Sequence, residues 1–284
     1  MSVLLAILLA ASPGLAAPPA TQLAGELGVH VVAPGESLVE IAPQYDVGFN
    51  AIAAANPQLD PWIPTAGAVA LIPTAWILPR AAAAGTVVVN LSEMRLFYLR
   101  AAGEAPVTFP VGVAMDPRAT PLGALRVIEK TAEPTWYPTR GILEEDPTLP
   151  AAVPPGPDNP LGSHALRLSH RTILIHGTNR PFGVGRKVSH GCIRLYPDDI
   201  RRLFRLVEVG TPVSIVREPV KVAVQGSRIY VECHGDDAVA ADPLEEAVRL
   251  LAERHVLRDV DPRKLVAAVR AKRGIPVRVD LDGD

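Results

Sequence analysis

The stretch IHGTNRPFGVGRKVSHGCIRL, from Ile175 to Leu195, sets the expectations for the rest of this 284-residue chain. It places His176 at the end of an apolar run, sixteen positions before Cys192, with glycines between them. A cysteine thiolate attacks carbonyl groups well, and a neighbouring imidazole can take the proton from the thiol. Gly191 leaves room for backbone amides to approach a developing oxyanion. These residues predict covalent acyl transfer through Cys192.

Two other uses of the same side chains stay open at this point. Cys192 and Cys233 are the only cysteines, so an exported protein could join them in a disulfide. Together with His176 and His190 they would also provide two histidines and two cysteines for zinc, although the spacing matches no common zinc module. We favour a free, nucleophilic Cys192 over both alternatives.

The composition restricts the class of function and the compartment. The net charge is −2 and no basic cluster is dense enough to follow a phosphate backbone, which argues against nucleic acid as a partner. With 29 prolines and 22 glycines, the chain should contain many loops and short strands. Residues 1–17 have the apolar core and small residues of a secretory signal peptide, so we expect export, with a buried helix or an uncleaved anchor as the alternatives.

Residues 28–73 predict a small βααβ unit. Ser37 and Glu40 have capping-box spacing before a helix over 38–42, and Asn56-Pro57 should end a second helix. Strands are expected at 30–32 and 68–72. The segment HVVAPGESLVEIAPQYDVGFNAIAAANP, followed by GAVALIP, resembles a LysM module, a family that binds the N-acetylglucosamine chains of peptidoglycan and chitin. A packing unit without affinity for glycan is the alternative.

From Thr86 onward the sequence consists of short β-rich runs separated by turn residues, which predict a mainly antiparallel, sandwich-like sheet. Residues 133–162 are proline-rich and irregular, as in a functional loop or in a passive surface loop. Pro197 should start a helix, and 212–216 should form a closing strand. Residues 219–284 predict a hairpin and two helices, a small α/β extension without a functional interpretation. The whole chain is thus expected to be an α+β multidomain protein.

The two halves of the opening stretch, His176–Asn179 and Ser189–Leu195, fit the pattern HGTN(x)9SHGCIRL. This pattern resembles the signature of the L,D-transpeptidases with a YkuD-type catalytic domain, in particular the YbiS/ErfK group of the Gram-negative envelope. Thr120–Gly123 and Asn159–Gly162 match further landmarks of that group. The resemblance implies four parts: a signal peptide 1–17, a LysM-like module 28–73, a catalytic domain 85–218 and a C-terminal extension 219–284.

The resemblance also implies a role for eight residues of this sequence. Cys192 would be the acylated nucleophile and His176 its general base, oriented by the carbonyl group of Gly177. The oxyanion hole would consist of the backbone amides of His190, Gly191 and Cys192. The substrate side would be formed by Ser189, Arg194 and Asn179.

The implied reaction acts on peptidoglycan in the periplasm and needs neither a metal nor an organic cofactor. Cys192 would attack the diaminopimelate carbonyl of a tetrapeptide stem and release D-Ala. An amine would then take the acyl group, either from another stem, giving a 3→3 crosslink, or from a lysine of an envelope lipoprotein. The partners implied are stem peptides, glycan strands and such a lipoprotein. An L,D-carboxypeptidase, a lipoprotein-releasing hydrolase with the same thiol, and a non-catalytic wall-binding protein are the alternatives.

Overall fold

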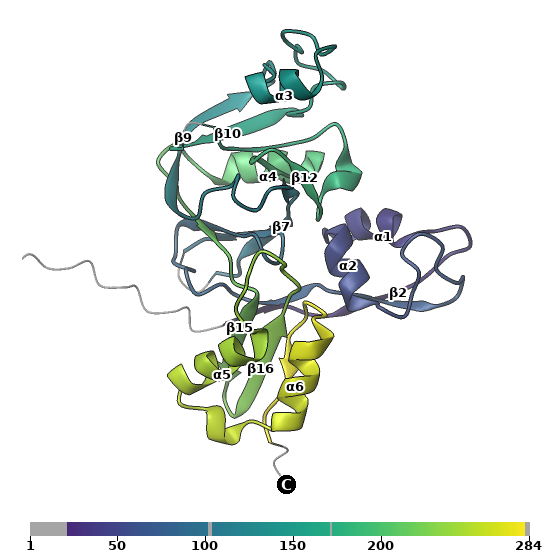
Figure 1. Ribbon diagram of the computed structural model, residues 1–284, viewed down its shortest axis with the longest axis vertical. Helices are drawn as coiled ribbons and strands as arrows, with labels where there is room; N and C mark the ends of the chain where they lie inside the picture. Colours follow the sequence, from purple (N-terminus) through teal and green to yellow (C-terminus); the bar gives the residue numbers. More distant parts are fainter. Residues whose placement is uncertain (1–21, 102–103, 171, 282–284) are drawn as a thin grey trace, which may run out of the picture.

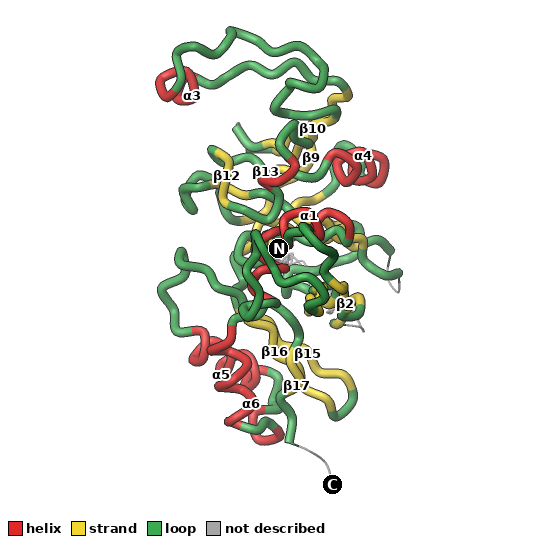
Figure 2. The backbone as a smooth tube through the Cα atoms, turned by 90° about the vertical axis from the view of Figure 1, so that its right-hand side faces the viewer, coloured by secondary structure: helices red, strands yellow, loops and turns green. Residues whose placement is uncertain are grey.

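The computed structural model describes residues 22–101, 104–170 and 172–281. The predicted signal peptide at 1–17 lies outside the described residues. The C-terminal region lies at one end of the long axis of the molecule and helix α3 at the other, and the N-terminal region lies at one side of the middle (Figures 1 and 2). Within the described ranges, no helix has the length and apolar character needed to cross a membrane.

The N-terminal region has the expected βααβ order. Its elements are β2 (Gly28–Val31), α1 (Leu38–Gln44), α2 (Phe49–Ala55) and β3 (Val69–Ile72). The predicted capping box is present, since the Ser37 side chain accepts from the Glu40 amide and Glu40 accepts in turn from the Ser37 amide. Strands β2 and β3 pair antiparallel, and both helices pack on the pair around a separate apolar cluster that includes Leu38, Ile41 and Ile52.

Helix α2 ends where the sequence predicted, at Asn56-Pro57, and Asn56 has a second task. Its buried side chain donates to the carbonyl groups of Ile52 and Leu71 and accepts from the Leu71 amide, with all three distances at 2.7–2.8 Å. One amide side chain therefore joins the end of α2 to strand β3. Helix α1 runs two residues further than expected, through Pro43 to Gln44.

The central region contains one eight-stranded sheet with the order β13-β11-β10-β9-β14-β5-β6-β7. The strands are β5 (Thr86–Asn90), β6 (Arg95–Leu99), β7 (Val107–Pro110), β9 (Gly123–Ala132), β10 (His164–Leu168), β11 (Leu174–His176), β13 (Ile193–Arg194) and β14 (Pro212–Val216). Neighbours pair antiparallel except β11 with β13 and β5 with β14, which are parallel.

The expectation of a sandwich-like domain needs correction on this point. Strand β9 is ten residues long; its first part pairs with β14, and its second part pairs with β10. Because one strand belongs to both halves, the halves form a single curled sheet, a half-barrel, instead of two separate sheets. The mainly antiparallel character of the sheet is as predicted.

Helix α4 (Pro197–Leu206) starts at the predicted proline and covers the sheet next to β10. Its Ile200 and Leu203 are fully buried in the large apolar cluster of the central region, together with Ile175 and Ile193 from the strands beside the opening stretch. The helix therefore packs, through the apolar core, against the strand that carries His176.

The proline-rich segment is more ordered than the sequence suggested. It contains helix α3 (Arg140–Glu145), which has no buried residue, and its ends are joined by the pairing of Trp136 with Val153. Asn159, one of the landmark residues, donates to the carbonyl groups of Pro134, Val153 and Pro154. A further short pairing was not predicted, between β8 (Val113–Ala114) and β12 (Lys187–Ser189).

The C-terminal region has its own apolar cluster. Its elements are β15 (Val220–Gln225), β16 (Arg228–Cys233), α5 (Pro243–Glu253), the 3₁₀ turn η2 (Leu257–Asp259), α6 (Pro262–Ala271) and β17 (Val277–Arg278). The hairpin and both helices lie where the sequence predicted them, and the helices pack on β15 and β16.

Two further strands lie at 22–28, where the sequence predicted only a connection, and at 74–77, directly before the alanine-rich linker expected at 78–85. Strand β1 (Leu23–Gly25) pairs with β4 (Ala75–Ile77), and β4 contacts strands β15 and β16 of the C-terminal region. Trp76, in β4, lies under the guanidinium group of Arg95 at 4.1 Å from the ring centre. The segment directly before the expected linker is therefore a packed part of the structure.

Candidate active site

His176 and Cys192 come together because two short strands pair in parallel. Strand β11 ends at His176 and pairs with β13, with Ile175 opposite Ile193. Cys192 is the residue directly before β13. Side chains alternate along a strand, and Ile175 and Ile193 both point into the core. The imidazole of His176 and the thiol of Cys192 therefore both lie on the other face of the sheet, away from Ile175 and Ile193.

The histidine has a defined tautomer. Its Nδ1 is 2.6 Å from the carbonyl oxygen of Gly177, which can only accept, so Nδ1 carries the hydrogen and Nε2 has the free lone pair. Burial and the positive charge of Arg194 lower the pKa of His176 to about 4, although the carbonyl groups of Gly177 and Leu161 oppose this shift. At neutral pH the ring is an uncharged base.

The thiol of Cys192 is also uncharged at rest. Burial raises its pKa, against the opposing influence of the backbone at Leu174 and of the charges on Arg194 and Arg167. Its Sγ lies 3.5 Å from the carbonyl oxygen of Thr172, which takes the thiol hydrogen. Among the described residues the thiol forms no hydrogen bond with His176, so the resting pair is not a thiolate–imidazolium ion pair.

A tight turn precedes the cysteine, and Ser189 holds it. The Ser189 hydroxyl group donates to the Cys192 carbonyl at 2.6 Å and accepts from the Gly191 amide at 3.2 Å. Gly191 has φ +137°, and a Cβ atom there would lie 3.0 Å from the carbonyl oxygen of Ala119, so only glycine fits. Ser189 is only 1% exposed and thus shapes the turn from inside instead of facing the substrate.

This turn changes the expected oxyanion hole. The amide of Gly191 is already bonded to Ser189, so it is not free for a substrate oxygen. The amides of His190 and Cys192 have no acceptor within the described part of the chain. Two of the three predicted amides thus remain available.

His190 and Asn179 both contact the proline-rich segment. The His190 Nε2 atom is 2.8 Å from a carboxylate oxygen of Glu145 in α3, and the Asn179 side chain donates to the Asp158 carbonyl at 2.9 Å. Both residues were expected at the site, but the structure uses them to hold this segment against the loop between His176 and Cys192. Glu145 was not predicted, because nothing in its local sequence indicates a partner 45 positions away.

Arg194 lies at the register position beside His176. Its Nε atom is buried and has no hydrogen-bond partner among the described residues. Burial lowers the pKa of its guanidinium group and the nearby charge of Arg180 adds to this, whereas Cys192 opposes it. Two arginine charges act on the thiol, those of Arg194 and Arg167. Arg167 pairs with Glu129 at 2.9 Å, whereas Arg194 has no carboxylate partner within the described ranges.

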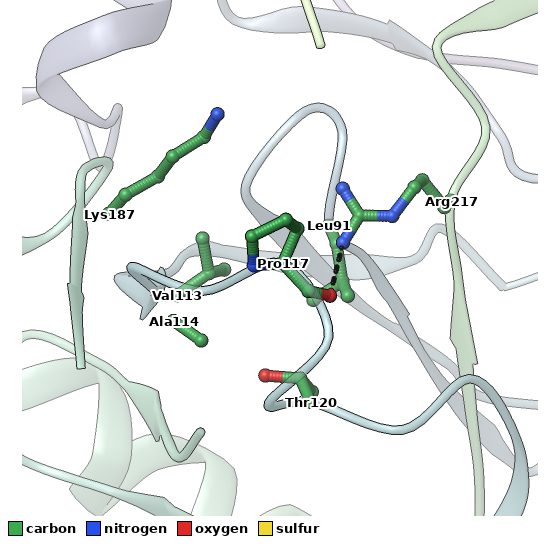
Figure 3. Close-up of a pocket in the computed structure, with 7 residues that line it drawn as sticks. All are labelled: Leu91, Val113, Ala114, Pro117, Thr120, Lys187 and Arg217. Carbon is green, nitrogen blue, oxygen red and sulfur yellow. Dashed lines mark hydrogen bonds between the residues drawn. The ribbon is translucent and has the colours of Figure 1, made fainter. Parts of the chain in front are cut away.

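A small hollow lies beside the turn (Figure 3). It is lined by Leu91, Val113, Ala114, Pro117, Thr120, Lys187 and Arg217. Arg217 donates to the carbonyl oxygen of Pro117, and the landmark residue Thr120 donates to the carbonyl oxygen of Gly191 at 2.8 Å. The loop that contains Pro117 and Thr120 is thus bonded both to Arg217 and to the backbone of Gly191.

The two alternative uses of the cysteines do not agree with this arrangement. Cys192 and Cys233 are both free, and Cys233 is buried in β16. The four proposed zinc ligands do not come together. The group of described residues that could hold a metal is instead Glu93, Glu232 and His234, and the Lys221 ammonium already lies 2.8 Å from a carboxylate oxygen of each glutamate.

Comparison with known proteins agrees with the site. The family model described as the L,D-transpeptidase catalytic domain YkuD matches residues 84–215. Three probable L,D-transpeptidases of Escherichia coli K12 are similar over most of their length. They are YcfS, 39% identical over 92% of this chain and 87% of the relative, YbiS, 37% identical over 92% and 89%, and ErfK/SrfK, 36% identical over 86% and 82%.

The matched range contains both strands of the parallel pair, the turn and the cysteine itself. The alignment with YcfS covers 92% of the chain, so it also includes the N-terminal region and most of the C-terminal region. The chain therefore belongs to the L,D-transpeptidase family and is an enzyme that acts on peptidoglycan through a YkuD-type catalytic domain.

Proposed function

We propose that this enzyme transfers a peptidoglycan stem through an acyl-enzyme on Cys192, with His176 as the general base. The observation that carries the proposal is the parallel pairing of β11 with β13, which puts the two side chains on one face. The hydrogen bond from His176 Nδ1 to Gly177 supports it further, because it leaves Nε2 as the basic atom.

In the first half of the reaction the thiol leaves the carbonyl oxygen of Thr172 and gives its proton to Nε2 of His176. The sulfur attacks the diaminopimelate carbonyl of a tetrapeptide stem, and the oxyanion accepts from the amides of His190 and Cys192. As the intermediate collapses, the proton moves from the imidazolium to the departing amine of D-Ala. The products are a thioester on Cys192 and free D-Ala.

The second half returns the enzyme to its resting state. An acceptor amine attacks the thioester carbonyl while His176 takes a proton from it, and that proton then protonates the departing Cys192 sulfur. The acceptor is the side-chain amine of another stem or a lipoprotein lysine. Water in place of the amine would make the enzyme an L,D-carboxypeptidase or a hydrolase.

Arg194 and Arg180 give the donor stem a place to bind. The stem carries carboxylates, including that of its terminal D-Ala, and these groups pair well with guanidinium groups. Both arginines lack a carboxylate partner within the described ranges, and the buried Nε atom of Arg194 has no acceptor there. We assign substrate binding to these two residues and a positioning role to Ser189, His190 and Asn179.

The proposal also assigns a location and a task to the N-terminal region. Its βααβ order and its resemblance to LysM modules support binding to the glycan strands that carry the stems. The relatives support an envelope enzyme, and we place this one in the periplasm, exported by the signal peptide at residues 1–17.

The test is mass spectrometry of the purified enzyme and of the muropeptides it is given. We expect wild type to gain the mass of one carbapenem and to release D-Ala from tetrapeptides, and Cys192→Ala to do neither. Cys233→Ala is the matched control, since its thiol is buried, and it should behave as wild type. A wild-type protein that is folded and free of any adduct would rule out the thiol mechanism.

The same spectra identify the acceptor. A crosslinked dimer, a stem joined to added lipoprotein, and a tripeptide without any partner correspond to the three fates of the thioester.

A further inference from the structure

The N-terminal region lies directly against the loop that joins His176 to Cys192 (Figure 1). At the start of α2, the amide of Phe49 donates to the Val184 carbonyl at 3.4 Å and the amide of Asn50 donates to the Gly185 carbonyl at 3.2 Å. Val184 is only 1% exposed. A segment more than 130 positions earlier in the sequence therefore holds the middle of the active-site loop.

Two glycines make this close approach possible. A Cβ atom on Gly185 would lie 2.4 Å from Gly48 Cα, and one on Gly48 would lie 2.7 Å from Gly185 Cα. Gly48 has an ordinary extended backbone, with φ −83°, so no conformational strain requires glycine there. The contact itself requires it, because any side chain would push the two backbones apart.

The next residue of the loop adds a cation–aromatic contact. The guanidinium carbon of Arg186 lies 3.8 Å from the ring centre of Phe49 and 5.2 Å from that of Trp62, and the two rings are 5.5 Å apart. Both aromatic residues belong to the N-terminal region. Contacts of this type contribute about 0.5–2 kcal/mol each, depending on their desolvation.

The same residues of the loop are also bonded to residues 111–113 of the central region, which follow β7. The Gly185 amide donates to the Val111 carbonyl, and the Val113 amide donates to the Arg186 carbonyl at 3.0 Å. Strand β12 begins at the next residue and leads to the Ser189 turn and Cys192. Residues 184–186 are thus bonded both to the N-terminal region and to residues 111–113 of the central region, a few residues before the nucleophile.

We propose that the N-terminal region is part of the active-site framework, and that its docking on residues 184–186 positions the Ser189–Cys192 turn for acylation. Gly48, Phe49 and Arg186 are accordingly positioning residues. The inference rests on the proposed role of Cys192. A region that served only as a tether to glycan would need no such contact with the catalytic loop.

The experiment uses the full chain with Gly48→Ala, which adds one methyl group at the contact and changes nothing in the catalytic region. Gly28→Ala is the matched control, because a Cβ atom there would lie at 3.4 Å or more from its neighbours. Hydrogen–deuterium exchange at residues 49–50 and 184–190 reports docking. The rate of Cys192 acylation is measured with a carbapenem, which carries no glycan, so glycan binding cannot influence it.

We expect Gly48→Ala to exchange faster at both segments and to be acylated about 10- to 100-fold more slowly, since misplacing a reacting group by about 1 Å has effects of this size. The loss should lie in the first-order acylation step and not in the carbapenem concentration that half-saturates it. If Gly48→Ala folds poorly, Arg186→Ala takes its place. It should likewise slow the first-order acylation step and leave the half-saturating carbapenem concentration unchanged.

Three results separate the possible failures. Faster exchange with unchanged acylation would overturn the inference and leave the proposed function intact. Unchanged exchange in both Gly48→Ala and Arg186→Ala would overturn it too, since the contact would not be what docks the region. A wild-type enzyme that fails to react with the carbapenem would refute the proposed function instead.

Discussion

His176 and Cys192 are both uncharged in the resting enzyme, and each owes this mainly to burial. Many cysteine enzymes hold a thiolate beside an imidazolium, which makes the nucleophile reactive before substrate arrives. Here the proton moves only when the sulfur attacks. A neutral thiol is oxidised less readily than a thiolate, which suits an enzyme proposed to work outside the cytosol.

This state predicts the pH dependence of acylation. The pKa of His176 is lowered to about 4, so the basic form persists as pH falls and is lost only near that value. The thiol pKa is raised, so thiolate forms only at alkaline pH. We expect the second-order rate of carbapenem acylation to be flat from about pH 5 to 8 and to fall tenfold per unit below about 4. An acid limb near the ordinary histidine pKa of about 6.5 would contradict the assignment.

The variant Ser189→Ala tests how much the turn before Cys192 contributes to acylation. In Ser189→Ala the Cys192 carbonyl and the Gly191 amide both lose a buried partner, which costs about 1–3 kcal/mol. We expect slower acylation with the thiol still present and titratable. Thr86→Ala is the control, because the Thr86 hydroxyl group also donates to a backbone carbonyl, that of Ala83, and Thr86 does not line the hollow beside the turn. Equal acylation rates in the two variants would show that the turn does not depend on Ser189.

At the scale of elements, the sequence predicted what local signals specify. The capping box before α1, the proline that starts α4 and the hairpin around Gly226 depend on residues within a few positions of one another. The strand pair β1/β4 and the dual pairing of β9 join segments far apart in the chain, and no local pattern records their partners. The sandwich expectation was wrong for this reason.

The same distinction applies to the site. Cys192, His176 and Gly191 could be proposed as site residues from the sequence because one short motif contains them, and their roles stay predictions. Glu145 and the Thr172 carbonyl were not, since a distant side chain and a backbone atom leave no signal in the sequence. The occupied amide of Gly191 could be recognised only once the Ser189 hydroxyl was placed.

The capping box offers a test at this scale. Ser37→Ala removes the side-chain acceptor for the Glu40 amide at the start of α1, which buries Leu38, Ile41 and Ala42. We expect a loss of about 1 kcal/mol in the unfolding free energy of the N-terminal region, measured by urea denaturation. Thr139→Ala removes the corresponding cap of α3, a helix with no buried residue, and should leave the stability unchanged. A similar loss in both variants would mean that packing does not govern the effect.

At the scale of the whole molecule, a buried charge cluster connects the central region, the C-terminal region and strand β4. Lys221 of β15 lies 2.8 Å from carboxylate oxygens of Glu93, in the central region, and Glu232, in β16, and it donates to the Ile77 carbonyl of β4. Burial alone would lower the pKa of Lys221, but the charges of Glu232 and Glu93 outweigh it and raise the pKa. The ammonium group therefore remains charged while fully enclosed.

Removing this charge should weaken the attachment of the C-terminal region. In Lys221→Met the buried carboxyl groups of Glu93 and Glu232 lose the ammonium group between them and keep only His234, which lies 2.6 Å from Glu232. Breaking a buried ion pair by removing one partner typically costs about 3–5 kcal/mol. We expect a corresponding loss in urea denaturation, with β15 and β16 losing protection from hydrogen exchange first. The control is Lys130→Met, since Lys130 pairs with the 80% exposed side chain of Glu208 and donates to the Val207 carbonyl. Its removal leaves no carboxylate buried without a counter-ion, so the loss of stability should be smaller than in Lys221→Met. Because no residue of the cluster belongs to the site, carbapenem acylation below the unfolding transition should stay at the wild-type rate. A Lys221→Met enzyme as stable as Lys130→Met would mean that the apolar contacts between the regions, and not the enclosed charges, hold the extension in place.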